Sequence, residues 1–102
     1  MNKVEIWKKY EVLDLYNDLK QAEEILSKLT GGSSNNFNSV EDFHNEFVEE
    51  LYEQKGENVP DFKKICLWFA PTSVWDDFVG FDGMELANRI YERAKKWNDN
   101  NL

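Results

Sequence analysis

The chain has 102 residues, and its 20 acidic and 12 basic side chains give a formal net charge of −8 at pH 7. This charge opposes contact with nucleic-acid phosphates or anionic lipids, so neither is expected as the main partner. The length corresponds to one domain, because two halves would each be too small to bury a stable core. The single Cys excludes an internal disulfide and favours a reducing compartment. The first 20 residues predict neither a signal peptide nor a membrane span, so we expect a soluble, cytoplasmic protein.

The first predicted helix covers residues 11–29. Gly31 and Gly32 are expected to end it, because glycine readily adopts the left-handed conformation found after helix ends. The first ten residues are compatible with a separate turn or with an extension of this helix. The apolar positions share one helical face and are Val12, Leu15, Tyr16, Leu19, Ala22, Leu26 and Leu29.

A polar loop at residues 33–38 precedes the second predicted helix, which covers residues 40–54. Ser39 has the side chain of an N-cap, and Gly56 is the natural stop. Phe37 is expected to anchor the loop to the core. The buried stripe of this helix should consist of Val40, Phe43, Phe47 and Leu51.

The stretch at 61–69 has mixed periodicity. We expect a short helix buried nearly all round, with a buried strand as the alternative. Pro71 should end this element, because proline cannot continue the hydrogen-bond ladder. Ser73 and Asp76 then have the spacing of a capping box, which predicts one helical turn at 74–79.

The last predicted helix covers residues 83–97. Asp82 and Glu85 form its capping pair, and its apolar stripe consists of Met84, Ala87, Ile90, Ala94 and Trp97. Arg93, Lys95 and Lys96 should lie in its final turns, near the negative end of the helix dipole. The whole chain, residues 1–102, is therefore predicted to be an all-α single-domain bundle of four main helices plus a short helical turn.

Negative charge is concentrated at residues 41–57, where seven acidic residues face one basic residue, Lys55, for a net charge of −6. Several of these carboxylates repel one another at i,i+4 spacing, which a basic partner would relieve. A solvated face that only confers solubility is the alternative. The candidate partner-binding residues in this segment are Asp42, Glu46, Glu49, Glu50 and Glu53.

A second candidate patch consists of Trp75, Asp76 and Asp77. An aromatic side chain beside carboxylates is a typical contact for an Arg or Lys of a partner. In the alternative interpretation, Trp75 and Phe78 lie in the core, and Asp76 and Asp82 cap helices. The expected partner of either candidate patch is a cationic protein.

No residue pattern predicts catalysis, a metal site or a cofactor. Glu41 and His44 have the Glu-x-x-His spacing of di-iron bundles, but such a site needs a second pair and the chain has no second His. Cys66 lies in an apolar run, where a thiol is typically a small buried apolar group. We therefore expect a protein that is not an enzyme.

The phrase WFAPTSVWDDFVG at residues 68–80, in a small acidic helical chain, resembles the immunity proteins that bacteria encode beside polymorphic or contact-dependent toxins. The resemblance concerns size, acidity and surface composition, and it assigns no role to any residue. It implies an inhibitor that covers the basic cleft of a toxin. Two alternatives stay open. One is a structural or regulatory helical module that self-associates into a homo-oligomer, and the other is an acidic mimic of nucleic acid.

Overall fold

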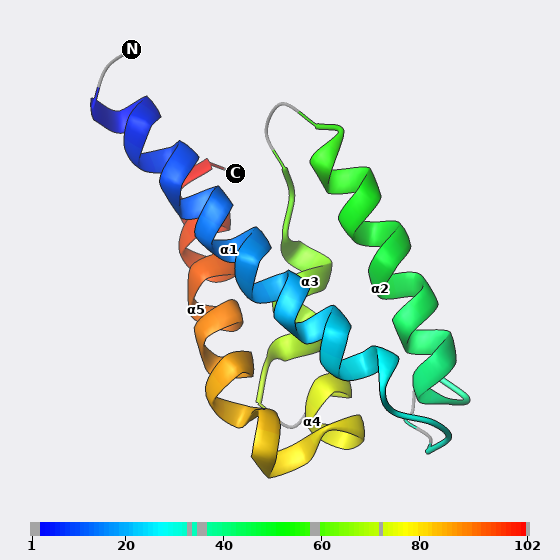
Figure 1. Ribbon diagram of the computed structural model, residues 1–102. Coiled ribbons are helices and arrows are strands. Elements are labelled where there is room, and N and C mark those ends of the chain that lie inside the picture. Colours follow the sequence, from blue (N-terminus) through cyan, green and yellow to red (C-terminus); the bar gives the residue numbers. More distant parts are fainter. Residues whose placement is uncertain (1–2, 33, 35–36, 58–59, 72, 102) are drawn as a thin grey trace.

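The computed structural model describes residues 3–32, 34, 37–57, 60–71 and 73–101, and Figure 1 shows them as a bundle of helices. Within these ranges the only pairing of β type is an isolated bridge between Ser34 and Phe37. The all-α prediction is confirmed, and the alternative of a strand at 61–69 is wrong. In chain order the elements are α1 (Lys3–Ser27), α2 (Val40–Lys55), α3 (Lys63–Phe69), α4 (Val74–Phe78), the 3-10 turn η1 (Gly80–Gly83) and α5 (Met84–Asn101).

Helix α1 is longer at its start and shorter at its end than the sequence predicts. It begins at Lys3, so the residues before position 11 extend the helix, and it ends at Ser27. Gly31 and Gly32 follow with φ angles of +75° and +74°, the left-handed conformation expected of them. Figure 1 shows α1 lying between α5 on one side and α2 on the other, with α1 and α5 antiparallel.

Helix α2 begins and ends where its capping residues predict. The Ser39 side chain accepts a hydrogen bond from the backbone N–H of Asp42 at 3.2 Å, as an N-cap should. Gly56 follows the last helical residue, but its φ of −81° is right-handed, so it ends the helix without a left-handed cap. Val40, Phe43 and Phe47 are buried as predicted.

Aromatic side chains form the core between α2 and the segment that follows Pro60. The ring of Phe43 on α2 lies 5.4 Å from Trp68 of α3 and 5.9 Å from Phe78 of α4, measured between ring centroids. Phe69 in turn lies 4.9 Å from Trp75. Each fully buried side chain of this kind contributes about 1.5–3 kcal/mol, so these rings hold the short helices against α2.

Helix α3 ends at Phe69 because Pro71 follows two residues later. Ala70, the residue before the proline, has φ −62° and ψ 153°, the extended conformation that a following proline imposes. The expectation that this helix is buried nearly all round is wrong, because Leu67 is 64% exposed. Trp68, the next residue along the chain, is buried.

The connection from α4 to α5 differs in its capping from the prediction. Ser73 precedes α4, but its side chain makes no capping hydrogen bond, and Asp82 lies inside η1. Gly80 closes the turn with φ +74°. Gly83 leaves no room for a side chain, because a Cβ there would lie 2.5 Å from Cγ1 of Val79. This close approach lets α5 start directly after η1.

Candidate partner-binding face

The outer side of α2 carries exposed carboxylates. The helix turns Val40, Phe43, Phe47 and also Glu50 toward the core. The other four predicted acidic residues, Asp42, Glu46, Glu49 and Glu53, are exposed and are called the acidic face below. None of these four carboxylates makes an ion pair or hydrogen bond to another described residue.

The four residues of the acidic face differ in how they interact with the dipole of α2. Asp42 lies in the first turn of α2, where a carboxylate also stabilises the positive end of the helix dipole. Glu46, Glu49 and Glu53 lie beyond that turn and have no such role. Glu53 is even close to the negative end, where an acidic side chain is unfavourable. These three carboxylates make no stabilising polar contact within the described structure.

Glu50 does not belong to the acidic face, although the sequence included it. It is only 6% exposed, and its carboxylate accepts a hydrogen bond from Nε2 of Gln54 at 2.8 Å. Nζ of Lys64 lies 3.6 Å from the same carboxylate. Gln54 Oε1 also accepts from the backbone N–H of Asp61 at 2.7 Å. Glu50 thus fastens α2 to the start of α3 and is not available to a partner.

Trp75 is likewise not available as a contact residue. It is 1% exposed, and its indole Nε1 donates to the carbonyl of Gly83 at 3.0 Å, so the alternative that places it in the core is correct. Asp76 and Asp77 are exposed on α4. Asp77 accepts a hydrogen bond from the hydroxyl of Ser34 at 3.0 Å, which ties α4 to the α1–α2 loop. Only the two aspartates of this patch face solvent.

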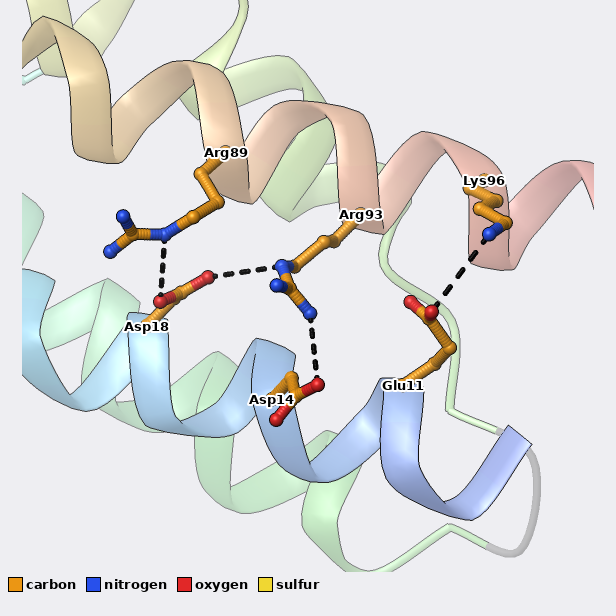
Figure 2. A network of polar contacts seen from close by, with 6 residues as sticks. All are labelled: Glu11, Asp14, Asp18, Arg89, Arg93 and Lys96. Atoms are coloured by element: carbon orange, nitrogen blue, oxygen red, sulfur yellow. Dashed lines mark hydrogen bonds and ion pairs between the residues drawn. The ribbon is translucent and has the colours of Figure 1, made fainter. Parts of the chain in front are cut away.

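A row of ion pairs between α1 and α5 was not predicted (Figure 2). Asp18 Oδ1 lies 3.0 Å from Nε of Arg89, and Asp18 Oδ2 lies 3.4 Å from Nε of Arg93. Asp14 pairs with Arg93 at 3.3 Å, and Glu11 pairs with Lys96 at 3.8 Å. We call these contacts the α1–α5 seam, formed by Glu11, Asp14, Asp18, Arg89, Arg93 and Lys96.

The seam corrects one interpretation of the sequence. Arg93 and Lys96 were expected to oppose the helix dipole in the final turns of α5, but the helix continues to Asn101 and has no basic residue in its last turn. Both residues instead form ion pairs with carboxylates of α1. A signal was present in the sequence, because Asp14 and Asp18 are four residues apart, as are Arg89 and Arg93. Matching spacings on two antiparallel helices favour such pairing.

His44 and Cys66 have structural contacts. His44 Nε2 lies 3.0 Å from Oε1 of Glu23 on α1, whereas Glu41 accepts a hydrogen bond from the backbone N–H of Gly31 at 2.7 Å. The Glu-x-x-His pair therefore faces two different partners. Burial raises the pKa of the Cys66 thiol, which disfavours the reactive thiolate. Among the described residues no group of three or more His, Cys, Asp or Glu side chains is arranged to hold a metal ion.

Comparison with known proteins assigns no family to this arrangement. A scan against protein-family models gives no match, and searches of curated proteins and of solved structures give none either. No described helix is long and apolar enough to cross a membrane. The functional argument therefore depends on the chain's own residues.

Proposed function

We propose that this protein is a non-enzymatic binding protein that uses the acidic face of α2 to bind a basic partner protein. The observation that carries the proposal is the concentration of unpaired charge on one helix. Glu46, Glu49 and Glu53 lie close together on α2 and meet no cation in the described structure, whereas the clustered carboxylates of α1 pair with α5. Charges held apart on a rigid helix attract an oppositely charged surface over about a Debye length, which accelerates association.

The most concrete form of this function is a toxin-neutralising immunity protein of a bacterium, acting in the cytoplasm. Covering a basic active cleft requires a small folded domain with a dense carboxylate surface, and α2 supplies both the rigidity and the charge. Asp76 and Asp77 on α4 provide a second acidic patch. They lie toward the start of α2, since Phe78 of α4 stacks on Phe43. One basic partner surface could contact both helices.

Affinity capture with matched charge variants tests the proposal. The triple variant Glu46→Lys, Glu49→Lys and Glu53→Lys changes the net charge by +6 and should abolish capture of the partner. The control variant Glu24→Lys, Glu92→Lys and Asp99→Lys makes the same change at exposed positions elsewhere and should retain most of it. High salt should release the partner, and the eluted protein should be a single basic one. Equal capture by both variants would exclude the acidic face.

A self-associating module is the second candidate, because several large apolar side chains are exposed. Phe81 is 83% exposed in η1, and Leu67 is 64% exposed on α3. Light scattering separates the two functions. A stable homodimer that persists at high salt and is lost in Phe81→Ser would favour self-association. A monomer at all salt concentrations would favour the acidic binding protein.

A further inference from the structure

A cavity of about 310 Å³ lies between α1 and α2, on the side of α2 next to the acidic face. This volume is at the small end of the range of ligand pockets, about 300–1,000 Å³, and suits a ligand of one or two rings. Apolar and aromatic side chains form most of the wall. The lining residues are Tyr16, Lys20 and Glu23 of α1, and Val48, Leu51, Tyr52 and Lys55 of α2.

The charge of this cavity is opposite in sign to that of the protein. Lys20 and Lys55 against Glu23 give the lining a net charge of +1, whereas the chain carries −8. The Glu23 carboxylate is already engaged, 3.0 Å from His44. Lys20 makes no contact with a described carboxylate, and Lys55 places its Nζ 5.5 Å from the centre of the Tyr16 ring. Neither ammonium group therefore has an anionic partner among the described residues.

Tyr16 contributes its ring to the wall of the cavity. Its hydroxyl is buried and has no hydrogen-bond partner among the described residues, so it does not open into the cavity. Burial raises the pKa of Tyr16, and the hydroxyl stays protonated. A molecule in the cavity therefore contacts the Tyr16 ring and not its hydroxyl.

We propose that this α1–α2 cavity binds a small aromatic anion, such as a carboxylate or sulfonate that bears one or two rings. The ring packs between Tyr16, Leu51 and Tyr52, and the anionic group pairs with Lys20 and Lys55. Aromatic walls with a few polar groups that fix the orientation are the usual composition of small-molecule sites. The site is independent of the acidic face, because it uses cations and a different side of α2.

Titration with 2-naphthoate tests the proposal, with 2-naphthamide as a neutral analogue of the same shape. Two-dimensional amide NMR should show saturable 1:1 binding of naphthoate, with shifts centred on residues 16–23 and 48–55. The amide should bind at least tenfold more weakly. Lys20→Met removes one charge from an exposed position, so folding is not at risk, and it should weaken naphthoate binding severalfold.

The double variant Lys20→Met and Lys55→Met should weaken binding at least tenfold. The matched control Lys63→Met and Lys95→Met removes two exposed lysines elsewhere and should leave the affinity unchanged. A thermal melt of each variant establishes that it is folded. Absence of saturable binding would overturn the proposal. Equal affinity for the acid and the amide, or shifts confined to another part of the chain, would overturn it as well.

Discussion

The α1–α5 seam and the acidic face of α2 are both rich in carboxylates, but cations pair with the carboxylates only in the seam. In the seam three acidic residues meet three basic residues across a helix interface. On the acidic face four carboxylates meet no cation in the described structure. Residue composition alone would count both as acidic helix surface. The difference shows that acidic composition alone does not reveal whether the fold itself compensates the charge.

The largest expected effect in this comparison is that of Asp18→Ala. Asp18 is 6% exposed, accepts a hydrogen bond from Arg89 and forms an ion pair with Arg93. Its removal leaves Arg89 without that acceptor and Arg93 with only Asp14. We expect the free energy of unfolding to fall by about 2–3 kcal/mol, measured by urea denaturation. Asp14→Ala is the control, because Asp14 is exposed and should cost less than about 1 kcal/mol. If both variants lost the same free energy of unfolding, the assignment of Asp18 as the buried centre of the seam would be wrong.

The next largest effect on stability is expected at Glu50, in comparison with its neighbour Glu49 on α2. Glu50→Ala should lower the free energy of unfolding by about 1–2 kcal/mol, because it removes the acceptor of Gln54 in a buried position. Glu49→Ala, one residue earlier and exposed, should change it by less than about 0.5 kcal/mol. Chemical denaturation of the two variants compares them directly. If the Glu49 variant were the less stable of the two, the assignment of Glu50 to the core would be wrong.

Charge reversal on the acidic face should leave stability intact or raise it. In the variant with Glu46, Glu49 and Glu53 changed to Lys, repulsion from Asp42 and Glu50 becomes attraction, although the new lysines repel one another. We expect a gain of at most about 1 kcal/mol at low salt that shrinks as salt is added. Thermal melts at two salt concentrations measure it. A large loss of stability would show that these carboxylates serve the fold and not a partner.

The smallest effect concerns an acidic group that belongs to neither region, the Cys66 thiol. Burial raises its pKa in the folded state above the ordinary value of 9.0, so the unfolded chain loses this proton first. The contribution of this thiol to stability is therefore unchanged at neutral pH and falls as the pH rises through the range near and above pH 9. Cys66→Ala should make the alkaline decline shallower. An unchanged slope would mean that the thiol is as well solvated in the folded state as in the unfolded chain.

Most of the fold could be predicted from the sequence because local signals agree with packing. Ser39 caps α2, Pro71 ends α3, and Gly80 closes the turn after α4, each by a conformational preference of one residue type. The start of α1 was less predictable, since Ile6, Trp7 and Tyr10 do not continue the apolar stripe of residues 12–29 in the sequence. The predicted loop at residues 33, 35 and 36 lies outside the described residues.

The candidate site could be predicted only in part, because burial of a polar residue depends on contacts between elements. Glu50 lies next to the buried stripe of α2, and only the position of Lys64 on another helix shows that it points inward. Trp75 is buried because Gly83 lets η1 approach it closely. The α1–α2 cavity requires two helices side by side, and a single helical wheel cannot show it. Helical spacing alone placed the other four candidate binding residues of α2, Asp42, Glu46, Glu49 and Glu53, correctly on its exposed side.

The antiparallel pairing of α1 and α5 has a consequence for the order of folding. Asp18 and Arg89 are 71 residues apart, so the seam forms only after nearly the whole chain has closed into a loop, whereas α3, α4 and η1 contact their near neighbours in sequence. Loop closure of this length is entropically costly, which favours late docking of α1. Contacts made late affect unfolding and not folding. In stopped-flow kinetics, Asp18→Ala should therefore accelerate unfolding and leave the refolding rate nearly unchanged, which would identify α1 as the last helix to join the bundle.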